Sequence, residues 1–218
     1  MALPAKLPML QVVNNFTEPF VDLICPVRGH NFPADHNYGL PSACFGIVPE
    51  VRKHPEIGIL SIPGIPDRKG KILLTSESCL RIRVPVTKIP LIYPLAGKKI
   101  QIGCHEIHIG IPSIAVLRPF PTLRARIVTI KGKEYMEPEG FLAAAQRQLD
   151  ALGIKGQVSI PLNRDGEPSR KTIKIKRFTI VGFTTEVSAL NEEDSLKLQY
   201  YGIGGRRHLG AGIFLPRR

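Results

Sequence analysis

The chain has 218 residues, 43% of them hydrophobic, and its 30 Lys and Arg outnumber 18 Asp and Glu to give a formal net charge of +12. This length suits one large domain or two domains of about 100 residues. No apolar run approaches the roughly 20 residues of a membrane helix, and residues 1–13 lack the features of a signal peptide. We therefore expect a cytoplasmic protein without a membrane partner, and the positive charge favours a polyanion such as nucleic acid.

The first half of the chain predicts a strand, a helix, two strands, a weak helix and a closing strand pair. The strand covers 19–28, and the helix covers 34–48 with Asp35 as its N-cap, although Pro41 lies within it. The later segments are two alternating apolar stretches (57–64 and 79–85), a weak helix or extended connection (86–97) and a strand pair (99–111) with a turn or bulge at His105-Glu106.

The second half repeats this order after a linker at 117–121. Its most regular element is a helix over 137–153, whose apolar stripe ends at Gly153 in the C′ position. The other segments are strands at 123–132, 156–162, 169–190 and 211–216, and a helix over 191–202 capped by Asn191. Each half therefore predicts β-α-β-β-α-β, so we expect an α+β fold of two tandem ferredoxin-like (RRM-like) domains, 1–118 and 119–218.

A glycine-rich segment, "GIGGRRHLGAGIF" at 202–214, connects the last helix to the last strand. A dinucleotide-binding motif would instead follow a strand and open a helix, and a P-loop would contain G-K-[ST]. The glycines indicate a backbone that lies very close to phosphates or to another part of the protein, with arginines for charge. A flexible surface turn is the alternative.

Four segments together resemble one known family. They are 202–214, "FPADHNYGLPSA" at 32–43, the strand and helix of 125–154, and "DSLKLQYYGIGGRR" at 194–207. In order and over nearly the whole chain, they resemble the CRISPR-associated repeat-processing endoribonucleases, the sixth family of Cas proteins, and most closely its myxobacterial-type subgroup. The resemblance implies two ferredoxin-like domains, metal-independent cleavage of CRISPR repeat RNA beside a hairpin, and retention of the product crRNA. It also implies other Cas subunits of a type I effector complex as partners.

Cleavage of RNA without a metal uses the ribose 2′-OH as nucleophile and leaves a 2′,3′-cyclic phosphate, so the protein must transfer protons and stabilise charge. Histidine suits this role because its unperturbed pKa is near 6.5. The resemblance makes His36 the catalytic residue and lets Tyr38 orient it or a phosphate. A solvated surface histidine and a core tyrosine are the alternatives, and His30 is the reserve candidate. Arg28 and Arg52 are possible sources of further charge.

No metal site is expected, because no cluster of His, Cys and carboxylates has ligand spacing and the four cysteines lie far apart. We expect no other cofactor. The expected RNA-binding residues are Gly204, Gly205, Arg206, Arg207, His208 and Gly210 of the glycine-rich segment, and Lys171, Lys174 and Lys176 of the basic segment 163–178. In that segment Thr172, Lys174 and Lys176 share one face of a strand or hairpin, opposite Ile173 and Ile175. A charged face that is merely solvated, a non-catalytic RNA-binding module and an inactive subunit of an RNA-guided complex remain alternatives.

Overall fold

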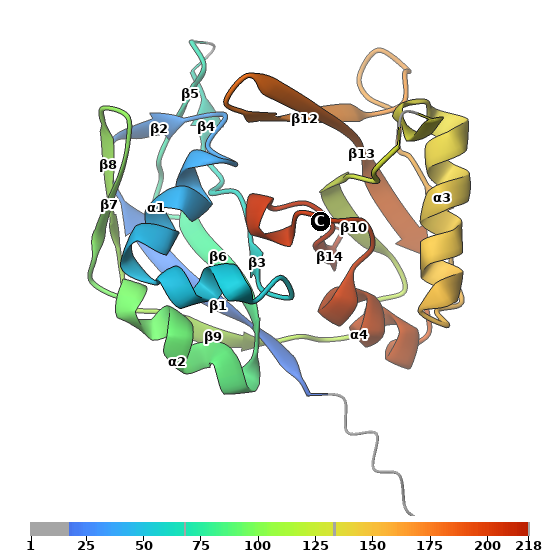
Figure 1. Cartoon of the computed structure of the whole chain (residues 1–218), viewed down its shortest axis with the longest axis horizontal. Helices are drawn as coiled ribbons and strands as arrows, with labels where there is room; N and C mark the ends of the chain where they lie inside the picture. Colours follow the sequence, from blue (N-terminus) through green and yellow to red (C-terminus); the bar gives the residue numbers. More distant parts are fainter. Residues whose placement is uncertain (1–17, 68, 133, 218) are drawn as a thin grey trace, which may run out of the picture.

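The computed structural model describes residues 18–67, 69–132 and 134–217, which form two α+β units side by side (Figure 1). The expectation about a signal peptide concerns residues outside this part of the chain. No helix among the described residues is long and apolar enough to cross a membrane.

The first unit has an antiparallel sheet in the order β3-β6-β1, and β9 lies on the other side of β1. The elements of its ferredoxin-like core are β1 (Phe20–Arg28), α1 (Gly39–Ile47), β3 (Gly58–Ile59), β6 (Cys79–Pro85), α2 (Ile89–Ile92) and β9 (Ser113–Val116). Further strands are the hairpin β7 (Lys99–Ile102) and β8 (His105–Ile109), and a small sheet of β2 (Asn31–Pro33), β5 (Lys71–Leu73) and β4 (Ile65–Pro66). Short 3-10 helices include η1 (Pro49–Lys53), η2 (Val86–Lys88) and η3 (Tyr93–Leu95).

The second unit repeats the sheet order as β11-β13-β10-β14. Its elements are β10 (Leu123–Val128), α3 (Pro138–Ala151), β11 (Gln157–Ser159), β13 (Phe178–Ser188), α4 (Glu192–Tyr201) and β14 (Phe214–Pro216). The additional strand β12 (Arg170–Ile175) pairs with β13, and the 3-10 helices η4 (Glu134–Met136) and η5 (Arg207–Leu209) complete the unit. The predicted β-α-β-β-α-β order is therefore present in both units.

Each unit has its own apolar core. In the first, alternate residues of β6 (Leu80, Ile82 and Val84) are fully buried under α1 and α2. In the second, Phe141 of α3 packs on Phe183 of β13 with ring centroids 4.9 Å apart. A division after Arg118 stays a prediction, and it is supported by these separate cores.

A buried arginine of the first unit connects the two units. Arg83 of β6 is completely buried, and its Nε and Nη2 donate to the two carboxylate oxygens of Asp22 at 2.8 and 3.0 Å. Its Nη1 donates to the backbone oxygens of Phe214 (2.6 Å) and Gln199 (3.1 Å) in the second unit. The guanidinium therefore joins the first sheet to α4 and β14, a contact that sequence periodicity did not reveal.

Several local predictions are confirmed. The Asn191 side chain caps α4 by accepting a hydrogen bond from the Asp194 backbone nitrogen at 2.8 Å. Gly153 follows α3 with φ +67°, as expected of a C′ glycine. The segment 86–97, which was left open, consists mainly of the helical turns η2, α2 and η3.

Other local predictions were wrong. Asp35 does not cap α1, because the helix begins four residues later, with Tyr38 in the N-cap position and no side-chain cap. Pro41 is compatible with this start, since it lies in the first turn, where a backbone N–H has no partner within the helix. The turn between β7 and β8 lies at Gly103 (φ +59°) and Cys104, before His105. Strand β9 was not foreseen at all.

Candidate functional site

The glycine-rich segment lies against the protein itself. Gly202, Gly204, Gly210 and Gly212 all have φ between +62° and +77°, a region that disfavours other residues. A Cβ at Gly204 would lie 2.7 Å from the Thr129 carbonyl oxygen, and one at Gly210 would lie 3.2 Å from the Ile59 carbonyl oxygen in the first unit. The sequence suggested that this backbone lies close either to phosphates or to another part of the protein. The close contacts with Thr129 and Ile59 show that the second explanation accounts for these glycines.

Hydrogen bonds hold the segment along β10 and α3. The Gly205 backbone nitrogen donates to the Thr129 carbonyl at 3.0 Å, and the Gly212 nitrogen donates to the Ile127 carbonyl at 2.9 Å. The Gly204 nitrogen donates to Gln148 Oε1 at 2.6 Å. Gly205 differs from its neighbours, because an added Cβ there would meet nothing within 4 Å and its φ is not positive. The side of the loop on which a Gly205 side chain would lie is therefore free of contacts with the described residues.

The two neighbouring arginines have different environments. Arg207 is 9% exposed, and burial lowers its pKa to about 10. Its guanidinium donates to the backbone oxygens of Glu56 (3.0 Å), Tyr201 (2.8 Å), Gly212 (3.3 Å) and Tyr200 (3.0 Å). Arg206 is exposed and adopts left-handed backbone angles (φ +66°, ψ +41°). The geometry thus makes Arg207 a structural residue, contrary to the expectation of an RNA contact, and leaves Arg206 available to a ligand.

His36 is a buried residue in this arrangement, with 2% exposure. Its Nδ1 lies 2.7 Å from the Pro33 carbonyl oxygen, and its Nε2 accepts a hydrogen bond from the Ile62 backbone nitrogen at 2.9 Å. These partners fix the neutral tautomer with the proton on Nδ1. Burial lowers the pKa of His36, and nearby Arg126 adds to that effect, whereas the Pro33 hydrogen bond and Asp35 oppose it. The geometry does not support the expected exposure of this ring to substrate.

Tyr38 is half-buried at the N-cap position of α1. Its neighbour Asn37, which sequence reasoning missed, is 6% exposed and connects the two units. The Asn37 Nδ2 donates to the Leu209 carbonyl at 2.8 Å and to Ser61 Oγ at 3.0 Å. The start of α1 is therefore fixed next to the glycine-rich segment.

A group of five side chains, here named the junction cluster, lies where η1 of the first unit meets η5 of the second. Its members are Phe45, Arg52, His54, Glu56 and His208. His54 Nδ1 lies 2.9 Å from Glu56 Oε1, with 24% of the His54 side chain exposed. His208 Nε2 lies 2.9 Å from the His54 carbonyl oxygen, and burial lowers the pKa of His208. The Phe45 ring contacts His208 edge-on and the Arg52 guanidinium by a cation–π contact, each at 5.1 Å.

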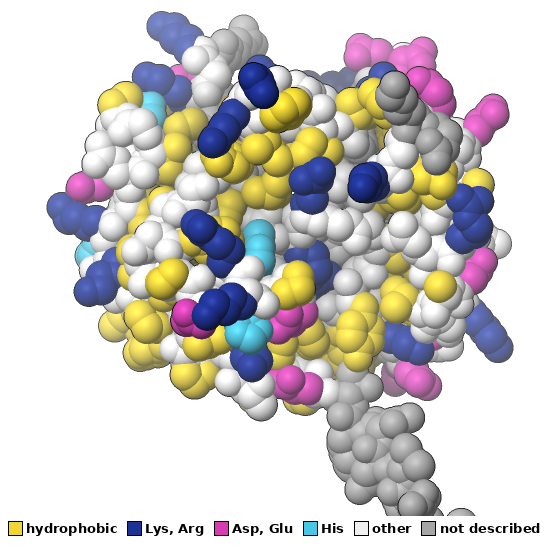
Figure 2. Space-filling view, viewed as in Figure 1, with side chains coloured by type: hydrophobic (Ala, Val, Ile, Leu, Met, Phe, Trp, Pro, Cys, Tyr) yellow, Lys and Arg dark blue, Asp and Glu magenta, His cyan; other side chains and the backbone are white. Residues whose placement is uncertain are grey.

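The junction cluster brings together groups suited to proton transfer. A carboxylate on Nδ1 places the His54 proton there and leaves Nε2 as an acceptor. His54 was among the six candidate histidines. The sequence did not predict its contact with Glu56, because a spacing of two residues alone does not indicate that the two side chains meet. Figure 2 shows histidine side chains beside Lys and Arg on the face where the two units meet.

The three predicted lysines lie on the hairpin of β12 and β13. Lys171, Lys174 and Lys176 are all exposed, whereas Ile173 between them is buried. Thr172 and Lys174 lie on the face of β12 opposite Ile173, and Lys171 lies on the same face as Ile173. Lys176 lies in the two-residue turn between the strands (φ +52°). In Figure 1 the tip of this hairpin is directed toward the first unit.

The reserve candidate His30 and the possible charge source Arg28 lie elsewhere on the surface. His30 and Arg28 are both exposed, and His30 Nδ1 has the Asn31 side-chain nitrogen at 3.3 Å. Within the described part of the chain, no three His, Cys, Asp or Glu side chains form a group that could hold a metal ion.

Comparison with known proteins gives concordant results. A family model described as "Cas6 Crispr" matches residues 21–218. A protein of Myxococcus xanthus (strain DK1622) named "CRISPR-associated endonuclease Cas6" is 36% identical over 197 residues, which cover 90% of this chain and 81% of that protein.

Solved structures share the fold at low sequence identity. One described as "CRISPR associated protein Cas6" has a TM-score of 0.62 at 12% identity and covers 92% of this chain and 99% of its own. A Cas6-related protein from Pyrococcus furiosus has a TM-score of 0.61 at 16% identity, covering 90% and 97%. These likenesses confirm the predicted α+β fold of two ferredoxin-like domains, and with the family model and the Myxococcus relative they show that the chain belongs to the Cas6 family.

Proposed function

We propose that this protein is an endoribonuclease that cleaves the repeat RNA of a CRISPR array in the cytoplasm. The observation that carries the proposal is the family match over residues 21–218, together with a relative named as a CRISPR-associated endonuclease. The junction cluster supports it, because it combines two histidines with the exposed Arg52 where the two units meet. The net charge of +12 suits a polyanionic substrate.

The chemistry we propose needs no metal ion. The ribose 2′-oxygen attacks the adjacent phosphorus, the bond from phosphorus to the 5′-oxygen breaks, and a 2′,3′-cyclic phosphate and a 5′-OH remain. A base must take the 2′-OH proton, and the leaving 5′-oxygen takes a proton from solvent. Cations beside the phosphate stabilise its developing charge.

We assign the base to His54. Its Nδ1 is paired with Glu56 at 2.9 Å, so its Nε2 lone pair is the proton acceptor, as in other carboxylate-oriented histidines. Arg52 of the junction cluster is exposed and supplies positive charge there. His208 lies beside His54 and orients it through the bond to its backbone oxygen.

The sequence-based assignment to His36 and Tyr38 is the second candidate. It requires the His36 ring to leave both the Pro33 oxygen and the Ile62 nitrogen when RNA binds. Apo geometry by itself does not rule out such a change, so the two histidines are compared directly below.

Binding of the RNA is assigned to the exposed cations. Arg206 and the hairpin lysines Lys171, Lys174 and Lys176 contact phosphates, and several such contacts explain how the product crRNA stays bound. Retention would also allow the loaded protein to join other Cas subunits in a type I effector complex. An inactive RNA-binding subunit is the alternative function, and the cleavage assay separates the two.

The test is incubation of repeat RNA with the protein in EDTA, followed by analysis of the RNA ends. We expect cleavage in EDTA with a cyclic phosphate end, and no cleavage of RNA with a 2′-deoxyribose at the cut position. His54→Gln should lower the cleavage rate about 10²-fold or more while RNA affinity is retained. His108→Gln, in an exposed position on β8, is the matched control.

The outcomes distinguish the alternatives. If His36→Gln stops cleavage in a folded protein and His54→Gln does not, the base is His36. A strict need for added divalent metal would overturn the mechanism. Tight binding of repeat RNA without any cleavage would favour the inactive subunit.

A further inference from the structure

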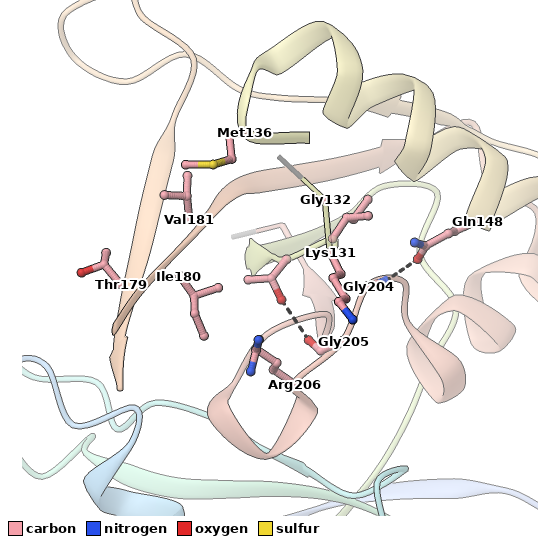
Figure 3. Close-up of a pocket in the computed structure, with 12 residues that line it drawn as sticks. Lys131, Gly132, Met136, Gln148, Thr179, Ile180, Val181, Gly204, Gly205 and Arg206 are labelled. Carbon is pink, nitrogen blue, oxygen red and sulfur yellow. Dashed lines mark hydrogen bonds between the residues drawn. The ribbon is translucent and has the colours of Figure 1, made fainter. Parts of the chain in front are cut away.

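A pocket of about 550 Å³ lies in the second unit beside the glycine-rich segment (Figure 3). None of its lining residues belongs to the junction cluster. It is lined by Thr129, Ile130, Lys131, Gly132, Met136, Gln148, Thr179, Ile180, Val181, Gly204, Gly205 and Arg206. We propose that this pocket binds one unpaired nucleobase of the RNA, and that Lys131 and Arg206 hold the phosphates next to it. This inference rests on the proposed function and adds a specificity site to it.

The walls of the pocket suit the flat, weakly polar faces of a nucleobase. Figure 3 shows Met136, Ile180 and Val181 on one side, opposite Lys131 and the Gly204–Arg206 backbone. Met136 is 41% exposed although it is apolar, so a ligand would remove apolar surface from water. The volume falls within the range of roughly 300–1,000 Å³ typical of small-molecule sites.

Polar groups that could contact base edges come from α3 and the loop. Gln148 Oε1 accepts from the Gly204 nitrogen at 2.6 Å, which fixes the orientation of the amide. Its Nε2 therefore presents N–H groups, for which no acceptor is found within the described part of the chain. Carbonyl oxygens and ring nitrogens of nucleobases are acceptors for such donors.

The charge at the rim identifies the occupant as part of a polyanion. Lys131 and Arg206 are both exposed, and neither forms an ion pair with the described residues. Arg206 is also in the left-handed region with φ +66°, which costs a residue with a Cβ free energy and points to a functional need for its side chain. Two cations beside an apolar pocket match a nucleotide, in which phosphate and base are adjacent.

Gly205 provides a selective way to fill the pocket. A Cβ at this position meets nothing within 4 Å, and its φ is not positive, so a larger side chain can be introduced without backbone strain. Gly205→Leu should therefore block the pocket in a folded protein. Ala143→Leu, on an exposed position of α3 outside the pocket, adds similar apolar bulk as the matched control.

The experiment measures the affinity of each protein for a set of repeat RNAs that each lack one base. With the wild type, loss of the base at one position should weaken binding about 5- to 150-fold, the effect typical of one stacked base. With Gly205→Leu, intact RNA should bind more weakly by a similar factor, and removal of that base should have no further effect. Ala143→Leu should behave as the wild type. Met136→Ala, a milder change in the wall, should reduce the effect of base removal if Gly205→Leu does not fold.

Equal penalties for base removal in the wild type and both pocket variants would overturn the proposal. Unchanged affinity of Gly205→Leu for intact RNA would overturn it too, and would indicate that the pocket receives something other than RNA. Failure of the proposed function gives a different result, because the wild type would then leave repeat RNA uncut, whereas the pocket is tested by affinity alone.

Discussion

Replacement of Arg206 by glycine should separate RNA binding from stability. The residue has φ +66° and ψ +41°, and these left-handed angles cost a residue with a Cβ about 1–2 kcal/mol. Glycine removes that cost, but it also makes the unfolded chain more flexible, which offsets about 0.4–1 kcal/mol. We therefore expect Arg206→Gly to unfold at the wild-type temperature or up to about 6 °C above it.

The same substitution should weaken RNA binding. Loss of one phosphate contact should reduce the slope of log K against log salt by about 0.7–0.9. The assays are filter binding at several salt concentrations and thermal unfolding of the same samples. Unchanged affinity and slope would refute the assignment of Arg206 as a phosphate contact, and a lower unfolding temperature would refute the argument from backbone strain.

The neighbouring Arg207 is the control for this experiment. Its guanidinium donates to four backbone oxygens in a nearly closed site, so its removal leaves buried carbonyls without donors. Arg207→Ala should lower the free energy of unfolding by about 3 kcal/mol or more, or roughly 6–12 °C in Tm. A loss of stability in Arg207→Ala without such a loss in Arg206→Gly would follow only if Arg207 is buried and Arg206 is exposed. Equal unfolding temperatures of the two variants would contradict this difference.

Three further changes test other parts of the fold. Arg83→Met leaves the buried Asp22 carboxylate with only the longer contact to Arg81 Nη1 at 3.5 Å, so urea unfolding should show a loss of about 3–5 kcal/mol. A loss below about 1 kcal/mol would contradict this interpretation. Burial lowers the pKa of His36 in the folded state, so wild-type stability should decrease as pH falls below about 6.5. The decrease should be smaller in His36→Gln, and an identical pH profile would show that His36 does not titrate in this way. Gly204→Ala should destabilise the protein more than Gly205→Ala, because only its Cβ approaches the Thr129 oxygen (2.7 Å) at a positive φ, and equal unfolding temperatures would contradict the close packing.

The elements that sequence predicted well have local causes. The helix over 137–153 was recognised because its apolar stripe and Gly153 lie within one continuous segment, and α4 was recognised because Asn191 caps it directly. The start of α1 was misplaced because Asp35 is as good an N-cap type as any residue nearby, and only tertiary contacts select a later start. Strand β9 escaped detection because Ile114 and Val116 are exposed on an edge strand (59% and 74%), so no buried face marks it.

The site was predicted less completely, because its geometry depends on distant partners. The burial of His36 involves the Ile62 nitrogen, 26 residues away, and no local pattern encodes that contact. The sequence alone does not distinguish Arg206 from Arg207. They differ because Tyr200 of α4 and Glu56 of the first unit supply backbone oxygens to Arg207 only. The spacing of the glycines did predict a close backbone approach, but it could not say what approaches.

The glycine-rich segment performs two tasks at once, and this explains its composition. It ends α4, where Arg207 donates to the last helical carbonyls, Tyr200 and Tyr201, groups that otherwise lack partners. It also joins the first unit, because His208 bonds the His54 oxygen and the Leu209 oxygen accepts from Asn37. Most of its residues are thus fixed by protein contacts, so substitutions there should alter folding and RNA processing together. Gly205 and Arg206 are the positions whose open surroundings allow the two effects to be separated.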